Sequence, residues 1–385
     1  MSEKAKILIV DDQRSVRTLL ATHMEEEGYI VDQAENGEAA LELALNKKYN
    51  LILLDVVMSG IDGFEVCKRI KEHSKYKNTP IIFVTGQSEE AANIKGYGVG
   101  SVDYIEKPIN INKLILKVGI YIKNSILMDK LEVYQGRMQA DMKKASAFYH
   151  AFLPDTSEIE SIQEEYNVKL DSYFLPYNEI GGDFWKVIAI DKNKFGILSI
   201  DFSGHGIASA LNVAYTNAIL SHDIKWSDPV QVMTFLNDHL NKVLINANFA
   251  TAIYFVFDKK KQSITYVNCA APYPILITES GNDAVFYEVS SRPVGIWSSD
   301  ELNLQSEKIY LNKGETFLIC SDVILESKHA ITKKRWMLEG LKNTIIKMKA
   351  EPEERLEVLC NIFLETAKKP LSDDLTLISI HSKKD

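Results

Sequence analysis

The sequence predicts an α/β domain with a doubly wound, five-stranded parallel sheet, then a long helix, then an α+β domain with a large sheet system. Apolar strand-like runs alternate with amphipathic helical stretches up to about residue 123. A stretch with little glycine and no proline follows from about 111 to 152, and strand-like runs dominate from about 156 onward. Alternating strands and helices are typical of parallel sheets, whereas strands with helices grouped apart are typical of α+β folds.

Five apolar runs define the strands of the first domain, which we expect to span residues 1–123. They are KILIV (6–10), YIVDQA (29–34), NLILLD (50–55), PIIFVT (80–85) and VDYIEK (102–107), separated by helical segments of roughly a dozen residues. In such sheets ligands bind beyond the carboxyl ends of the strands. The polar residues that end these strands are therefore expected to meet at one edge: Asp11, Asp12, Asp55, Thr85 and Lys107.

These polar strand ends suit the chemistry of phosphoryl transfer. Asp11, Asp12 and Asp55 can hold a hard divalent cation such as Mg²⁺, which prefers oxygen ligands. Asp55 can also accept a phosphoryl group, because carboxylates form aspartyl-phosphates. Lys107 and the hydroxyl of Thr85 can then bind the phosphoryl oxygens. We therefore expect Asp55 to be the phosphorylated residue.

Residues 1–123 resemble the receiver domain of response regulators. The resemblance rests on VDD at the first strand, LLDVVMSGIDG around Asp55, VTG at Thr85 and EKP at Lys107–Pro108. It implies that a histidine kinase donates the phosphoryl group and that Mg²⁺ is bound beside Asp55. It also implies that Thr85 and Tyr104 move on phosphorylation and form a switch with Lys107.

A long helix from about 111 to 152 is expected to join the two domains, with residues 124–155 as the linker. Apolar residues recur along it at spacings of four, three, four, four and three: Leu127, Leu131, Tyr134, Met138, Met142 and Ala145. This near-heptad stripe can pair with a copy of itself as a coiled coil, which would make the chain a homodimer. A helix that packs on its own domain is the alternative.

Aspartates recur in the second half of the chain, which we expect to form a domain over residues 156–385. They are Asp183 in GGDF, Asp201 in DFSGHG, Asp322 in LICSDV, and Asp373 and Asp374 in SDDLTLISI. Carboxylates at sheet edges suit Mg²⁺ or Mn²⁺ rather than zinc, which favours histidine and cysteine. Two such ions can activate a bridging water and stabilise an in-line displacement at phosphorus.

Glycines follow the second of these aspartates. Gly204 and Gly206 would allow the turn after Asp201 to bring the backbone close to bound metal ions. His205 lies between them, where a catalytic and a structural role are both open.

Residues from about 150 to 385 resemble metal-dependent serine/threonine phosphatases of the PPM family, in the bacterial branch that includes sporulation and stress-response regulators. The resemblance rests on FLP, GGDF, DFSGHG, FATAIYFVFD, RPVGI, SDV and DDLTLISI. It implies a β-sandwich flanked by helices and a substrate phosphorylated on serine or threonine, such as an anti-sigma factor antagonist. It also implies two Mn²⁺ or Mg²⁺ ions, with the backbone carbonyl after Asp201 assisting. The residues that it assigns to catalysis are Asp183, Asp201, Asp322 and Asp373, and these bind the metals, with Asp374 as a less favoured ligand.

Three positions depart from the pattern of that family. Ala271 in NCAAPYP replaces a histidine, Val323 in SDV replaces a glycine, and Lys186 stands where an acid commonly follows GGDF and its aromatic. None of these changes removes a metal-binding carboxylate. They leave open an alternative function, in which the domain is a degenerate adaptor that binds a sigma factor or another client. GGDF also resembles the diguanylate cyclase signature, but the acid that this signature requires before the phenylalanine is missing.

Composition narrows the class of partner. The 44 basic and 53 acidic residues give a formal net charge of -9, and the cluster DKKKQ at 258–262 is interpreted as a hairpin turn. Nucleic acid is therefore not expected as the main partner. No apolar run approaches the length of a membrane helix, so no membrane association is expected. Four scattered cysteines without a CxxC pair favour buried thiols in a reducing compartment, and we expect a cytoplasmic protein.

Overall fold

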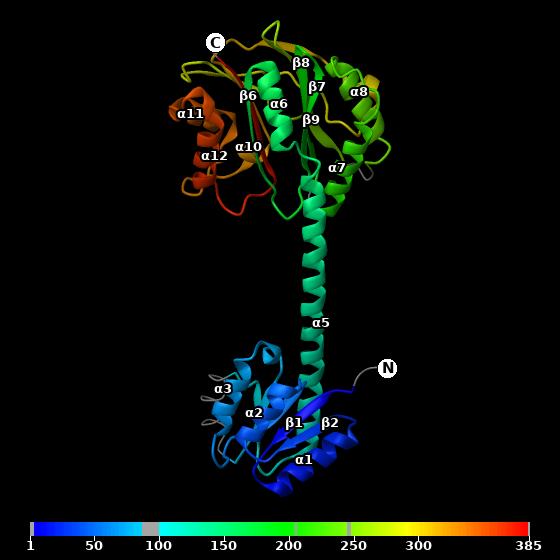
Figure 1. Ribbon diagram of the computed structural model, residues 1–385, viewed down its shortest axis with the longest axis vertical. Coiled ribbons are helices and arrows are strands. Elements are labelled where there is room, and N and C mark those ends of the chain that lie inside the picture. The colour runs from blue at the N-terminus through cyan, green and yellow to red at the C-terminus, as the bar shows by residue number, and fades with distance from the viewer. Residues whose placement is uncertain (1–3, 87–99, 205, 245–247, 384–385) are drawn as a thin grey trace. The chain divides into compact units, whose positions relative to one another are not determined.

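The computed structural model describes residues 4–86, 100–204, 206–244 and 248–383 (Figure 1). The chain divides into two compact units, residues 1–139 and 140–385. One helix, α5 (Ile111–His150), begins in the first unit and ends in the second, which confirms the long helix expected from the sequence.

The first unit contains a five-stranded parallel sheet in the order β2-β1-β3-β4-β5. This order confirms the predicted doubly wound sheet. The helix expected between β4 and β5 falls on residues 87–99, outside the described residues. The strands are β1 (Lys6–Val10), β2 (Ile30–Ala34), β3 (Leu51–Asp55), β4 (Ile81–Thr85) and β5 (Asp103–Glu106), and the connecting elements are α1 (Arg14–Glu26), α2 (Gly37–Asn46), α3 (Gly63–Lys71) and the 3₁₀ turn η1 (Ser74–Tyr76).

Both faces of this sheet are buried, as the continuous apolar strands require. Successive side chains of a strand point to opposite faces. On β1, Ile7 and Ile9 therefore join one core with residues of α1 and α5, including Leu114. Leu8 and Val10 join the opposite core with residues of α2 and α3. The sheet therefore lies between two apolar cores, and neither core includes the polar residues Asp11 and Asp55 at its carboxyl edge.

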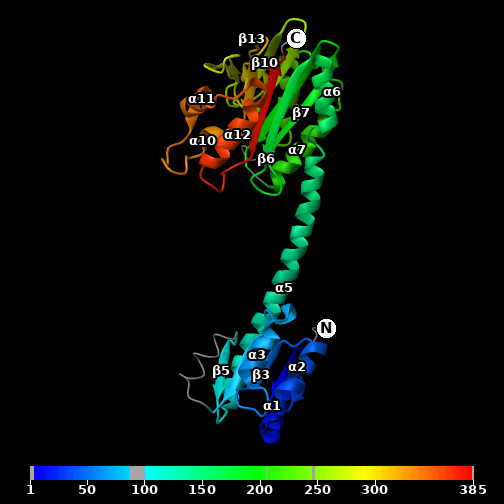
Figure 2. The same cartoon turned by 60° about the vertical axis from the view of Figure 1, so that its left-hand side comes forward.

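The second unit contains two five-stranded antiparallel sheets (Figure 2). Their strand orders are β13-β10-β9-β8-β7 and β12-β11-β14-β15-β6. The first sheet is formed by β7 (Asp183–Asp191), β8 (Lys194–Phe202), β9 (Ala250–Asp258), β10 (Ser263–Cys269) and β13 (Glu307–Tyr310). The second is formed by β6 (Val168–Leu175), β11 (Ile275–Ile277), β12 (Ala284–Phe286), β14 (Thr316–Cys320) and β15 (Leu375–Ser382).

The two sheets pack face to face, and helices cover their outer faces. Phe255, Phe317 and Ile380 belong to the core between the sheets. Helices α7 and α8 pack on the outer face of the first sheet and α11 and α12 on that of the second. The predicted β-sandwich flanked by helices is therefore confirmed. The helices of this unit are α6 (Thr156–Tyr166), α7 (Ile207–Ile219), α8 (Pro229–Leu240), α9 (Ser299–Leu302), α10 (Val323–Glu326), α11 (Met337–Lys347) and α12 (Arg355–Thr366), with a 3₁₀ turn η2 (Pro352–Glu354) before α12.

The apolar stripe of α5 divides into two parts. Leu127, Leu131, Tyr134 and Met138 are all more than half exposed. Met142 instead packs against the core that α7 and α8 share with the first sheet of the sandwich. The exposed part of the stripe is therefore an apolar surface that the rest of the described chain leaves uncovered.

Two further findings concern the whole of the described chain. None of its helices is both long enough and apolar enough to cross a membrane. All four cysteines are buried: Cys67, Cys269, Cys320 and Cys360.

Candidate metal centres

The first centre lies at the carboxyl edge of the parallel sheet in the first unit. Asp55 is the last residue of β3 and is 3% exposed, and the similarly buried Asp11 directly follows β1. Each of Asp11, Asp12 and Asp55 offers one oxygen atom, and these atoms lie within 4.8 Å of one another. Asp12 is exposed, so the cluster opens to solvent on one side. Oxygen donors at this spacing fit a hard cation such as Mg²⁺.

A lysine completes this centre. The Nζ atom of Lys107, which follows β5, donates hydrogen bonds of 2.8 Å to Oδ2 of Asp11 and to Oδ2 of Asp55. Burial raises the pKa of Asp55, and the ammonium group of Lys107 opposes that rise. Burial acts to lower the pKa of Lys107, but its two carboxylate partners raise it overall. The receiver cluster therefore contains its own counter-charge.

The two remaining receiver residues lie on the neighbouring strands. Thr85 is the fully buried last residue of β4, and Tyr104 lies on β5, where the pairing register sets Thr85 beside Glu106. The Nζ atom of Lys117 lies 5.5 Å from the centroid of the Tyr104 ring. Both residues are thus near the strand ends that carry Asp55 and Lys107.

The second centre lies where the two sheets of the sandwich meet. Asp183 is the first residue of β7 and Asp201 the next to last of β8, and antiparallel pairing sets them directly opposite each other. In the other sheet, Asp322 follows β14 and Asp374 immediately precedes β15, with Cys320 paired to Leu377. Antiparallel register thus collects aspartates from four strand ends.

Hydrogen bonds join the two sheets at this centre. The carboxylate of Asp374 accepts bonds from the backbone N–H groups of Tyr177, at 2.7 Å, and of Gly182, at 2.5 Å. The hydroxyl of Thr376 donates a 2.5 Å bond to Oδ2 of Asp183. Asp374 is therefore occupied in fixing the loop before β7, and Asp183 is held from the opposite sheet.

The carboxyl groups of the second centre raise one another's pKa values. Burial raises the pKa of Asp183, and the charge of Asp201 raises it further. Burial raises the pKa of Asp201 to about 8, with a contribution from Asp322. Burial and Asp373 raise the pKa of Asp322 to about 6. Among the described residues, no lysine or arginine forms an ion pair with Asp183, Asp201 or Asp322.

Glycines lie beside two of these aspartates, after Asp201 and in the loop before Asp183. Gly204 and Gly206 have φ values of 93° and 87°, in the left-handed region that glycine adopts at little cost. A side chain at Gly181 would collide with the carboxylate of Asp374. His205, whose role the sequence left open, lies outside the described residues.

Sequence reasoning assigned no role at this centre to Thr376 or to Tyr149. Tyr149, near the end of α5, is 2% exposed, and its hydroxyl donates a hydrogen bond to the backbone carbonyl of Asp183. No local motif marks Tyr149, because its partner lies 34 residues further along the chain. The contact connects the linker helix directly to a residue of the predicted metal site.

The residues that depart from the phosphatase pattern have defined surroundings. Lys186 donates a 3.0 Å hydrogen bond to Oδ1 of Asn217 on α7. Val323 is buried at the start of α10, and Ala271 packs against the core between the sheets. Ala270 has a φ of 60°, in the left-handed region that favours glycine.

Family models match both units. The model described as the response regulator receiver domain matches residues 7–119, and the model of stage II sporulation protein E matches residues 191–383. The SiaA-PP2C domain of Pseudomonas aeruginosa has a similar fold, with a TM-score of 0.55 and 18% identity. This likeness covers 65% of the present chain and 98% of that domain.

Curated relatives match the receiver region. The transcriptional regulatory protein ResD of Bacillus subtilis (strain 168) is 42% identical over 124 residues, which are 32% of this chain and 50% of ResD. The transcriptional regulatory protein YvrH of the same strain is 35% identical over 159 residues, which are 41% of this chain and 62% of YvrH. The chain thus spans between half and two thirds of the lengths of these relatives.

Fold and matches together define the class of protein: a response-regulator receiver domain followed by a PPM-type phosphatase domain. The chain belongs to the stage II sporulation protein E family.

Proposed function

We propose that this chain is a response regulator whose output is metal-dependent removal of phosphate from serine or threonine of a regulatory protein. The observation that carries the proposal is the set of aspartates that four strand ends bring together, without a lysine or arginine to pair with Asp183, Asp201 or Asp322 among the described residues. In this proposal residues 1–123 receive the signal, residues 124–155 transmit it and residues 156–385 act on the substrate.

The receiver cluster supports phosphorylation of Asp55. Its carboxylate attacks phosphorus of a phosphohistidine on a histidine kinase, the N–P bond breaks, and an acyl phosphate forms. Lys107 already contacts both Asp11 and Asp55, so its ammonium group is placed to bind the new phosphoryl oxygens. Mg²⁺ held by Asp11, Asp12 and Asp55 would neutralise the charge that develops in the transfer. Thr85 and Tyr104 would report the phosphorylated state to the rest of the chain.

The second cluster supports hydrolysis. Asp183, Asp201, Asp322 and Asp373 would hold two Mn²⁺ or Mg²⁺ ions, assisted by the backbone carbonyl of Phe202. When bound, two such metal ions supply a hydroxide at neutral pH and stabilise an in-line displacement at phosphorus. In the described residues, only the receiver aspartates bring three oxygens within 4.8 Å. The phosphatase aspartates are spaced more widely, so ions held there would complete their coordination with water. Asp374 would orient the loop before β7 rather than bind metal.

Helix α5 is the proposed route between the two centres. Leu114 and Val118 fix its beginning in the receiver core, and Tyr149 near its end bonds to Asp183. The exposed stripe from Leu127 to Met138 supports pairing with a second copy, since a dimer would cover this apolar surface. Phosphorylation of Asp55 would then alter how two copies pair and how Tyr149 holds Asp183.

The proposal also names two partner proteins and a cellular compartment. A histidine kinase is the phosphodonor, and an anti-sigma factor antagonist phosphorylated on serine or threonine is the substrate. Four buried cysteine thiols are typical of a reducing compartment, which supports the cytoplasm.

A degenerate adaptor that binds a sigma factor or another client is the second candidate function. Ala271, Val323 and the left-handed Ala270 favour it, because each departs from a phosphatase motif or bears backbone strain. The presence of all five candidate metal-binding aspartates in the second unit argues against the adaptor function. Hydrolysis of p-nitrophenyl phosphate by the full chain, with Mn²⁺ and with a chelator, separates the two. Turnover that requires Mn²⁺ supports the phosphatase, and its absence in both conditions supports the adaptor.

A further inference from the structure

A hairpin with four positive charges follows α10 in the second unit. Residues 328–335 contain Lys328, Lys333, Lys334 and Arg335 and no acidic residue. An antiparallel bridge pairs Lys328 with Arg335. The backbone N–H of Lys368 donates a 2.7 Å hydrogen bond to the carbonyl of Lys328, which brings Lys368 and its neighbour Lys369 to the same place. We call these six residues the basic cluster.

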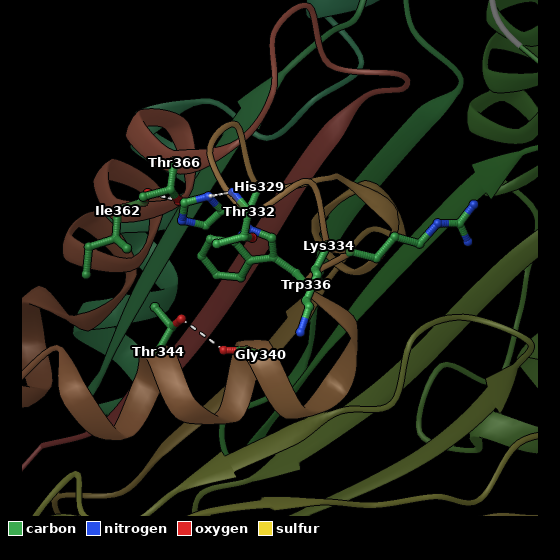
Figure 3. A pocket seen from close by; sticks show the side chains of 9 residues that line it. His329, Thr332, Lys334, Trp336, Gly340, Thr344, Ile362 and Thr366 are labelled. Carbon is green, nitrogen blue, oxygen red and sulfur yellow. Dashed lines mark hydrogen bonds between the residues drawn. The ribbon is translucent and has the colours of Figure 1, made fainter.

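A buried tryptophan anchors the hairpin. Trp336 is 7% exposed, and its ring lies edge-on to that of Phe363 on α12, with 5.2 Å between centroids. Figure 3 shows Trp336 between α11, which carries Gly340 and Thr344, and α12, which carries Ile362 and Thr366. The charges of the hairpin therefore stand on a fixed base, and binding a partner would cost little ordering of the backbone.

The charges of the basic cluster are not neutralised within the described chain. All six side chains are exposed, and among the described residues none of them forms an ion pair. Four of them, Lys328, Arg335, Lys368 and Lys369, line a surface cavity of about 430 Å³. Glu326 and Ser372 also line it, so four cations face one carboxylate. In a chain of net charge -9 this is a local excess of positive charge, and it complements an anionic partner.

The basic cluster adjoins the aspartate centre along the chain. Lys369 precedes Asp373 by four residues, and Lys328 follows Asp322 by six. Since an extended chain spans at most about 3.5 Å per residue, Lys369 lies within about 14 Å of Asp373. If the phosphorylated residue of an extended peptide binds at the aspartates, the peptide residues a few positions before or after it can therefore reach the cavity of the basic cluster.

We propose that the basic cluster binds an acidic segment next to the phosphorylated residue of the substrate protein. This inference rests on the proposed phosphatase function, whose substrate class it narrows. An acidic peptide fits because it carries few charges and can keep them away from the aspartates. A nucleic acid strand fits less well, because its evenly spaced phosphates would also approach Asp322 and Asp373. Contacts of exposed charges mainly affect association, so we expect an effect on KM rather than on kcat.

A binding experiment tests the basic cluster without requiring catalysis. Fluorescence anisotropy would measure the Kd of the full chain for an unphosphorylated peptide rich in glutamate, and for its glutamine counterpart. The glutamate peptide is expected to bind at least about tenfold more tightly at low salt. The triple variant Lys328→Gln, Arg335→Gln, Lys368→Gln should lose this preference. The matched control Lys259→Gln, Lys260→Gln, Lys261→Gln removes three charges from the β9–β10 hairpin and should keep it.

Either of two results with the peptides would overturn the inference, and so would one result with a nucleic acid probe. The peptide results are equal affinity of the natural chain for the two peptides and an unchanged preference in the triple variant. The nucleic acid result is tighter binding of an oligothymidylate of equal charge that depends on the same three residues, which would assign the basic cluster to nucleic acid.

A kinetic experiment keeps the inference separate from the proposed function. With Mn²⁺, kcat/KM of the triple variant should fall about tenfold for a phosphopeptide flanked by glutamates, through KM. It should stay unchanged for a glutamine-flanked phosphopeptide and for p-nitrophenyl phosphate. An equal fall for all three substrates would mean that the basic cluster supports the fold rather than the substrate. Failure of the natural chain on all three would contradict the phosphatase, while the anisotropy result would still decide the docking site.

Discussion

The two aspartate clusters of this chain are built from the same residue type but balance their charge in opposite ways. In the receiver, the ammonium group of Lys107 lies 2.8 Å from both Asp11 and Asp55. In the phosphatase unit, Asp183, Asp201 and Asp322 have no such cation among the described residues, and burial raises all three pKa values. A cluster with an internal cation can keep its form without metal, whereas one without a cation needs bound metal or retained protons to balance its charge.

The largest effect that this comparison predicts is on activity. Asp201→Asn removes a central charge of the phosphatase cluster while it conserves shape, so Mn²⁺-dependent turnover should fall by about three orders of magnitude or more. Isothermal titration should show lost or much weaker Mn²⁺ binding, with the circular dichroism spectrum unchanged. The exposed Asp300→Asn is the control and should behave as the natural chain. Full turnover by Asp201→Asn would mean that these aspartates are structural.

The receiver cluster should show an equally complete effect on labelling. A small phosphodonor with Mg²⁺ should add one phosphoryl group to the chain by mass, and Asp55→Asn should acquire none, since the nucleophile is gone. Asp201→Asn should label normally, because it alters only the other cluster. Equal labelling of Asp55→Asn would reject the assignment.

A moderate effect is expected where α5 connects the clusters. Phosphorylation at Asp55 should change phosphatase activity five- to hundred-fold, which corresponds to a coupling of about 1–3 kcal/mol. Light scattering should show an accompanying change in mass or shape. Leu131→Asp with Met138→Asp should abolish the response, because it places charges in the exposed stripe. The control variant, Gln135→Asp with Gln139→Asp, adds the same charge at polar positions and should preserve the response to phosphorylation. If the stripe variant still responds fully to phosphorylation, α5 only tethers the two units and does not transmit the signal.

The stability of the phosphatase unit should depend on pH, because its aspartate cluster lacks a cation among the described residues. An acid whose pKa is raised by folding keeps a proton that the unfolded chain has released. Without metal, the free energy of unfolding should therefore fall as pH rises from about 4, through about 6 for Asp322, to about 8 for Asp201. Mn²⁺ at a hundred times its Kd should restore about 2.7 kcal/mol at pH 8.

Tryptophan fluorescence during urea unfolding isolates this effect. All four tryptophans, Trp185, Trp226, Trp297 and Trp336, lie in the phosphatase unit. Asp201→Asn should flatten the dependence on pH. A metal-free chain that gains stability between pH 5 and pH 8 would contradict the charge argument.

The smallest expected effect concerns the backbone of the phosphatase unit. Ala270→Gly should relieve a left-handed strain of about 1–2 kcal/mol, offset by about 0.4–1 kcal/mol from the freer unfolded chain. The net gain in unfolding free energy should therefore lie between about 0 and about 1.6 kcal/mol, measured by the same fluorescence. Ala271→Gly is the control, since Ala271 lacks a positive φ and should gain nothing. A loss of stability in Ala270→Gly would show that the methyl group of Ala270 stabilises the fold by more than the backbone strain costs.

The fold and both clusters follow from local patterns in the sequence. Apolar runs that end in Asp11, Asp55 and Thr85 imply a parallel sheet with a polar carboxyl edge, because strand alternation and helix periodicity are set by neighbouring residues. The glycines that follow Asp201 likewise imply a tight backbone turn, because residues without a side chain adopt positive φ values at little cost. Such patterns identify which residues belong to an edge.

Contacts between distant segments had no such signal. The bond of Tyr149 to Asp183 and that of Thr376 to Asp183 join positions 34 and 193 residues apart. The extent of the basic cluster was missed for the same reason, since Lys368 and Lys369 join Lys328 only through the fold. Lys333, Lys334 and Arg335 are adjacent in the sequence, as are the lysines of residues 258–262, but neither run by itself indicates a site. The helical stripe was visible, but its division between exposed Leu131 and packed Met142 depends on where the phosphatase core lies.

The hydrogen bonds that Asp374 makes to the loop before β7 have a consequence for synthesis on the ribosome. Asp11 and Lys107 of the receiver cluster are 96 residues apart, so this half can fold while the rest is still being translated. Gly182 and Asp374 are 192 residues apart, and β15 enters its sheet between β14 and β6. The phosphatase centre cannot close until β15 has left the ribosome. Under the proposed function, Asp55 of a nascent chain could therefore be phosphorylated before the phosphatase centre has formed.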